Sequence, residues 1–255
     1  MKPQASNAIA ILDPLLQKLG PQYLAFWTLP NAILTLSGAR PYCDGVFWDD
    51  AEKGLLEKWS QEISESAAIV TENIKAVWWQ ASIAEARPGE KFAGYDCFFE
   101  PGLRYMLAQT KLLKSTTFDQ FQKQTSFAGF LEVIIADLEH QPEFKVYSPE
   151  NLNDVAFGLL LGYPDKAIVE SVEKWQEQDS FAEPLMDADI RGGGYYICPQ
   201  PVYSYPRHLV SDPSITAHEQ LWSTILRDYY TSDFHKSLEQ DKAFMKKAKE
   251  LGNLK

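Results

Sequence analysis

The pattern that decides most about the fold lies at residues 148–178, which read SPENLNDVAFGLLLGYPDKAIVESVEKWQEQ. Ser148 and Pro149 are residue types that helices favour at the N-cap and at the first position. Gly162 is typical of a helix end, and Pro164 of the start of a new helix. Apolar side chains recur at helical spacing on both sides of this junction, at Leu152, Val155, Leu159, Leu160, Ile168, Val172 and Trp175. The stretch therefore predicts two consecutive helices joined by Gly-Tyr-Pro.

The same periodicity extends outward from this pair in both directions. It predicts further helices at about residues 9–19, 49–63, 70–86, 101–114, 127–138, 214–230 and 232–251. The helix near 49 rests on Asp49 and Glu52, which have the spacing of a capping box. Strand patterns are fewer, at Tyr23–Leu29 and at Tyr195–Tyr205, where neighbouring prolines confine a strand to a sheet edge.

These elements predict an α+β fold that is mostly helical. We expect a small antiparallel sheet built from the N-terminal strands and the 195–205 segment. No linker or internal repeat divides the chain, so we expect one globular domain over residues 1–255, with the helical pair 214–251 as a candidate subdomain.

Composition narrows the classes of protein that this chain can be. Of its 255 residues 45% are hydrophobic, and 14 Phe, 12 Tyr and 7 Trp argue against disorder. The net charge of −11 disfavours nucleic acid as a partner. The sequence contains no apolar run long enough for a membrane span and no secretory signal pattern. Three cysteines without a Cys-x-x-Cys pair fit a reducing compartment, so we expect a soluble cytoplasmic protein.

Common catalytic and cofactor motifs are absent from the sequence. There is no P-loop, no dinucleotide-binding Gly-x-Gly-x-x-Gly and no Gly-x-Ser-x-Gly. His218-Glu219 begins like a zinc-protease helix, but Trp222 stands where the second histidine is required. The sequence therefore predicts no cofactor and assigns no reaction.

One loop has the composition of a site for an anionic molecule. Asp187, Asp189 and Arg191 precede three glycines, Gly192, Gly193 and Gly194. Two carboxylates at this spacing can share a metal cation, while Arg191 and glycine N–H groups can hold a phosphate or carboxylate. The alternative is an acidic surface loop that turns into the Tyr195 strand.

A second hypothesis is nucleophilic catalysis by a thiol. Cys198 would need His208 or His218 within hydrogen-bond reach, with Asp187, Asp189 or Asp212 orienting the imidazole. Cys198 also alternates within a strand-like run, which is typical of a small buried residue.

The tyrosines at 195–205 favour a third kind of site. Tyr195, Tyr203 and Tyr205 fall on one face of the predicted strand, where they suit recognition of a partner, although core packing is an alternative. We therefore expect a non-enzymatic binding or interaction protein with an aromatic surface, in complex with a protein partner or as a homo-oligomer. The alternative is an enzyme that acts on a phosphate-bearing or other anionic small molecule through the Asp187–Gly194 loop.

Overall fold

The structure is a computed structural model that describes residues 2–19, 29–49, 77–87, 90–114, 117–124, 127–173, 181–182 and 205–250. It confirms the expected class, since the protein is α+β and mostly helical with antiparallel sheets. None of the helices among these residues is both long enough and apolar enough to cross a bilayer.

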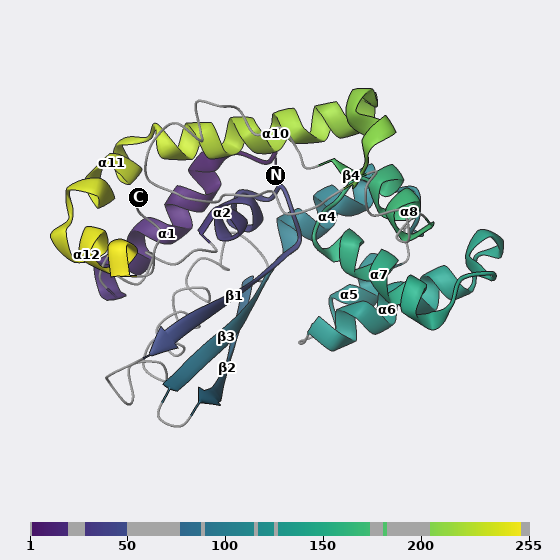
Figure 1. Ribbon diagram of the computed structural model, residues 1–255, viewed down its shortest axis with the longest axis horizontal. Helices are drawn as coiled ribbons and strands as arrows, with labels where there is room; N and C mark the ends of the chain where they lie inside the picture. The colour runs from purple at the N-terminus through teal and green to yellow at the C-terminus, as the bar shows by residue number, and fades with distance from the viewer. Residues whose placement is uncertain are drawn as a thin grey trace.

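Three strands form an antiparallel sheet that extends away from the helices (Figure 1). They are β1 (Tyr42–Asp49), β2 (Val77–Arg87) and β3 (Glu90–Phe99), in the order β1-β3-β2. The register places Tyr42 opposite Phe98 on one side of β3 and Trp78 opposite Phe98 on the other. The central strand β3 leads directly into the helices, so its end fixes where the next helix begins.

The helices that follow β3 surround one apolar core. They are α4 (Glu100–Gln109), α5 (Thr117–Phe121), α6 (Phe127–Glu139), α7 (Pro149–Leu160) and α8 (Asp165–Glu173), with a 3-10 turn at Pro142–Phe144. The core is built from aromatic and aliphatic side chains, including Tyr42, Phe98, Phe121, Phe130, Ile134, Leu138, Leu152, Val155 and Leu159. Phe98 stacks on Phe130 at 4.3 Å between ring centroids, which ties the sheet to α6.

A second group of helices joins the two ends of the chain. Helices α1 (Ala5–Leu19) and α2 (Leu29–Ser37) pack against α10 (Pro213–Tyr230), which runs along one side of the molecule and also reaches α8 (Figure 1). The chain ends with α11 (Asp233–Gln240) and α12 (Lys242–Glu250). The two groups of helices therefore meet where the start of α10 faces α8.

The junction forms as its sequence predicts over the described residues 148–173. The Ser148 side chain accepts a hydrogen bond from the Asn151 N–H, and Gly162 ends the α7 turn with a φ of +74°. Helix α8 then begins at Asp165, directly after Pro164. The predicted helices near 9–19, 127–138 and 214–230 are also confirmed.

Three predictions of helices need correction. Residues 77–86 are strand and not helix, because they pair with β3 along almost their whole length and tertiary pairing overrides the helical spacing. The helix predicted over 101–114 ends at Gln109, because Thr110 and Lys111 turn to hydrogen-bond Asp165. The last predicted helix is split, since Asp241 accepts hydrogen bonds from the N–H groups of residues 243 and 244 and starts a new helix.

Other predictions fall wholly or partly outside the described residues. The proposed capping residue Asp49 is the last residue of β1, and the helix predicted after it lies outside the described ranges. Of the strand expected at 23–29, only Leu29 is described, and it is the first residue of α2. Tyr205 begins β5 (Tyr205–Pro206), which pairs with β4 (Phe181–Ala182) in a second sheet.

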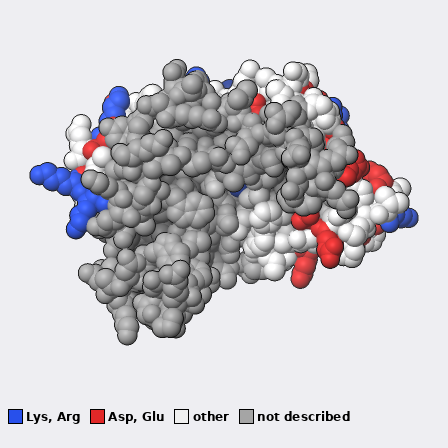
Figure 2. Space-filling view, in the orientation of Figure 1, with Lys and Arg blue, Asp and Glu red and all other residues white. Residues whose placement is uncertain are grey.

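Charged side chains are unevenly distributed on the described surface. In the face shown in Figure 2, acidic side chains gather over the half of the molecule that holds α5 to α8, and basic ones over the α11–α12 end. Lys242 and Lys246 are exposed on α12. On this face the described acidic and basic side chains therefore lie at different ends.

Candidate functional site

Most of the predicted site residues lie outside the described ranges. These are Asp187, Asp189, Arg191, Gly192, Gly193, Gly194, Tyr195, Cys198 and Tyr203. The metal, thiol and aromatic-surface hypotheses that rest on them stay predictions. Tyr205, His208 and His218 are described, and the structure places these three in different settings.

His208 contacts a carboxylate at the surface. It lies in the 3-10 turn Arg207–Ser211, and its Nε2 is 2.6 Å from Oε2 of Glu170 on α8. The His208 side chain is exposed over 54% of its area, so the pair contributes little to stability. Asp212, predicted as an orienting carboxylate, instead caps α10 and binds Lys166 at 2.7 Å.

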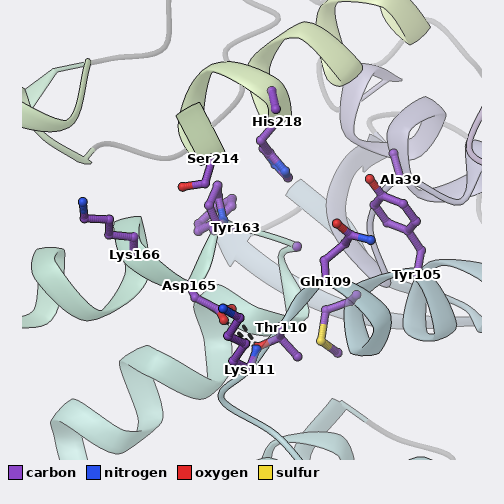
Figure 3. Close-up of a pocket in the computed structure, with 14 residues that line it drawn as sticks. Ala39, Tyr105, Gln109, Thr110, Lys111, Tyr163, Asp165, Lys166, Ser214 and His218 are labelled. Carbon is purple, nitrogen blue, oxygen red and sulfur yellow. Dashed lines mark hydrogen bonds between the residues drawn. The ribbon is translucent and has the colours of Figure 1, made fainter. Parts of the chain in front are cut away.

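His218 lines a pocket between the two groups of helices. The pocket has a volume of about 380 Å³ and is bounded by α4, by the α7–α8 junction, by the first turns of α10 and by the turn after α2. In Figure 3 the His218 ring enters from α10, while Tyr105 and Gln109 rise from α4 on the opposite side. Its volume is within the range of ordinary small-molecule sites.

The wall of the pocket is partly apolar. Its apolar members are Ala39, Met106, Gly162, Pro164 and Ala217, together with the rings of Tyr105 and Tyr163. The Gly-Tyr-Pro junction thus contributes three consecutive residues to the wall. A positive φ at Gly162 makes this turn available without strain.

Several polar groups of the pocket are already bound to other protein groups. Asp165 accepts hydrogen bonds from the Thr110 hydroxyl at 2.7 Å and from the Lys111 backbone N–H at 2.7 Å. Ser214 is held by Asp212, which also binds Lys166. The Lys166 ammonium and the Asp212 carboxylate favour each other's charged form, so the pKa of Lys166 is raised and that of Asp212 is lowered. These groups shape one end of the pocket.

Three other polar groups are not used in this way. Within the described ranges, no hydrogen bond or ion pair engages the Tyr105 hydroxyl, the Gln109 amide or the Lys111 ammonium. Partial burial raises the pKa of Tyr105, so its hydroxyl stays protonated at neutral pH. All three groups can therefore donate a hydrogen bond to a bound molecule.

A buried arginine lies directly behind this wall. Arg40 is 1% exposed, and its Nε and Nη1 donate to the Tyr42 carbonyl and to Asn31 Oδ1, each at 2.9 Å. Its Cζ lies 5.6 Å from the centroid of the Trp222 ring. No carboxylate in the described part of the chain forms an ion pair with it, which is uncommon for a buried charge.

Two glycines allow the chain to pack this closely around Arg40. A Cβ on Gly162 would lie 2.8 Å from the Arg40 Cβ. A Cβ on Gly102 would overlap the Arg40 carbonyl oxygen and lie 2.9 Å from the Pro41 Cα. Because Ala39 and Gly162 both line the pocket, the backbone and Cβ of Arg40 lie directly behind these two lining residues.

The electrostatic effect of Arg40 reaches His218. Burial is the main cause that lowers the pKa of His218 to about 3, and the positive charge of Arg40 lowers it further. The ring as a whole is half-buried, but its Nε2 is fully buried, and the ring centroid lies 4.5 Å from that of Trp222. His218 is therefore a neutral imidazole at physiological pH.

Among the residues that line this pocket, His218 is the one that the sequence identifies as a candidate site residue. His218 was a candidate, but for catalysis with Cys198, and Tyr163 was identified only as part of a helix junction. Arg40 does carry a signal, because it is the single charged residue between Leu29 and Cys43. Tyr105, Gln109 and Lys111 have no such signal in the sequence.

Metal-site geometry is not found in the described ranges, where no three His, Cys, Asp or Glu side chains come together. Cys43 is buried and is a free thiol. Comparisons of the chain with protein-family models, with curated proteins and with solved structures find no match.

Proposed function

We propose that this protein is a non-enzymatic binding protein that holds a small organic molecule in the pocket between α4, α8 and α10. The observation that carries the proposal is the set of polar groups on this partly apolar wall. Tyr105, Gln109 and Lys111 offer donors that no described protein group uses. A few unused polar groups on an apolar wall are typical of ligand sites.

The chemistry of the pocket favours binding over catalysis. A general base works best when its pKa lies near the working pH, and His218 has a pKa of about 3. Asp165 is the other candidate base in the pocket, but both of its oxygens already accept hydrogen bonds. Neither group is prepared to take a proton from a substrate.

The pocket is also well suited to bind without rearrangement. Its wall combines the turn after α2, helix α4, the α7–α8 junction and α10, each of which is packed into a core. A preformed site avoids the entropy cost of ordering flexible groups. A cytoplasmic location and a protein partner or second copy, expected from the sequence, belong to the same proposal.

The test uses a substitution that fills the pocket from the exposed side. Ala217 lines the pocket on α10, so Ala217→Phe should occupy it without entering the core. Ala136→Phe is the matched control, because Ala136 is also an exposed helical alanine but lies on α6, outside the pocket. Both variants should fold as the natural chain does.

We would screen a library of small organic fragments against the full chain and both variants by saturation-transfer NMR. We expect a set of fragments that bind the natural chain and Ala136→Phe but not Ala217→Phe. The proposal fails if no fragment binds, or if the fragments that bind are unaffected by Ala217→Phe.

A further inference from the structure

We infer that the ligand of this pocket is a small organic carboxylate and that the buried guanidinium of Arg40 sets this preference. The inference rests on the proposed function, because it names the class of molecule that the same pocket holds. It follows from the charges around the pocket and from the polarity of the groups left unused there.

Arg40 supplies a positive charge that the described protein groups do not neutralise. It is enclosed by the protein and bound to two neutral oxygens, one from the Tyr42 backbone and one from Asn31. A cation in a buried setting is screened only weakly, so its field extends farther than that of a surface lysine. The Arg40 guanidinium lies 5.6 Å from the Trp222 ring centroid, and the Trp222 ring lies 4.5 Å from that of His218, which lines the pocket.

His218 is the lining residue on which the charge of Arg40 acts. Besides burial, the positive charge of Arg40 disfavours the imidazolium form and contributes to the low pKa of His218. A potential that destabilises a cation at this wall stabilises an anion placed there.

The charge balance favours a ligand with a single negative charge. Among the described residues, three charged groups line the pocket: Lys111, Asp165 and Lys166. Two more lie next to these or to the wall, since Asp212 binds Lys166 and Arg40 lies behind Gly162. Lys166 is paired with Asp212, and Glu170, which also acts on Lys166, does not line the pocket. Asp165 offsets one of the two remaining cations, so one positive charge is left.

The unused groups point to the same class of ligand. The Tyr105 hydroxyl, the Gln109 amide and the Lys111 ammonium can all donate, and a carboxylate only accepts. The first turns of α8 and α10 also line the pocket, and the N-terminal ends of helices carry a partial positive charge. Met106 and the rings of Tyr105 and Tyr163 fit an apolar body attached to the acid.

The first test compares probes of one shape and different charge. Benzoate, benzamide and phenyl phosphate would be titrated into the full chain at pH 7.5 by calorimetry. We expect benzoate to bind at least about tenfold tighter than benzamide, which corresponds to one charge interaction in a partly buried site. We also expect it to bind tighter than the phosphate dianion.

The outcomes separate this inference from the proposed function. Equal affinity for benzoate and benzamide, or fragment hits in the pocket that are all neutral, overturns the carboxylate and leaves a binding pocket. Tighter binding of phenyl phosphate overturns the single-charge argument. A pocket that takes no fragment at all overturns both proposals.

The second test assigns the preference to Arg40. Arg40→Met should weaken benzoate binding at least about tenfold and change benzamide binding by less than about threefold. Lys242→Met, which removes an exposed lysine from α12, is the charge-matched control and should change neither. Equal loss of both probes in Arg40→Met would show that Arg40 only supports the structure.

Arg40→Met also removes two buried hydrogen bonds, so a measurement on the natural chain complements it. Because a buried cation is weakly screened, the ratio of benzoate to benzamide affinity should change by less than about threefold between 0.05 M and 0.5 M NaCl. A ratio that falls to one at high salt would assign the preference to surface lysines and overturn the role of Arg40.

Discussion

Gly102 is the position where the addition of one methyl group should disturb both the fold and the pocket. A Cβ there would overlap the Arg40 carbonyl oxygen and lie 2.9 Å from the Pro41 Cα, and both neighbours are backbone atoms. Backbone cannot move aside as a flexible side chain can, so α4 and the turn after α2 must separate. We expect Gly102→Ala to lower the free energy of unfolding by about 3 kcal/mol, the upper range for overpacking.

Gly158→Ala is the matched control, since Gly158 is also a glycine within a helix. Its nearest neighbours are side-chain atoms of Ile168, at 3.0 to 3.4 Å, and these can shift. The gain in helix propensity of about 1 kcal/mol offsets the crowding, so its stability should stay within about 1 kcal/mol of the natural chain.

The measurement is urea unfolding followed by circular dichroism, with thermal melting as a second readout. At about 2–4 °C per kcal/mol, Gly102→Ala should melt roughly 10 °C lower than the natural chain. A loss below about 1 kcal/mol in Gly102→Ala, or an equal loss in both variants, would refute the close approach of α4 to Arg40.

Three further predictions test other parts of the structure. Burial lowers the pKa of His235 to about 4, and burial together with the charge of Arg40 lowers that of His218 to about 3. Between these values and about pH 6.5 the unfolded chain binds more protons than the folded chain, so the free energy of unfolding should fall by several kcal/mol from pH 7 to pH 4. Urea unfolding at a series of pH values measures this, and a flat profile would contradict both pKa values. Ser148→Ala removes the N-cap of α7 and should cost about 1 kcal/mol, whereas Ser148→Asp should restore it in the same assay. Gln141→Leu removes the hydrogen bonds that the Gln141 amide donates to the carbonyls of Leu112, at 2.7 Å, and of Asp137, at 3.2 Å. We expect the free energy of unfolding to fall by about 1–2 kcal/mol, measured by thermal melting. No change would show that water replaces the amide.

Local signals in the sequence predict the helices that depend on local interactions. The α7–α8 junction is determined by Ser148, Gly162 and Pro164, which act on their own neighbours in the chain. Strand β2 is different, because Trp78 and Trp79 suit a strand only when β3 lies beside them, and that pairing involves residues far along the chain. The helical period of the sequence therefore predicts a helix at 77–86, where pairing with β3 produces a strand.

The pocket is harder to predict for the same reason. Its members come from positions 39, 105–111, 162–166 and 214–218, which no local pattern connects. The burial of Arg40 depends on Gly102, Gly162 and Trp222, which lie around it only in the folded chain. Sequence could identify His218 as unusual, but not that burial and a distant arginine keep it neutral.

The packing of α10 against α1 and α2 has a consequence for the synthesis of the chain. Helix α2 ends at Ser37 and α10 begins at Pro213, so a ribosome adding about 5–20 residues per second needs roughly ten seconds or more to join them. During this interval α1 and α2 lack the helix α10 that packs against them in the folded chain. Helices α4 to α8 can already pack by then. Nascent chains that end before Pro213 should therefore expose α1 and α2 to chaperones that bind apolar helices.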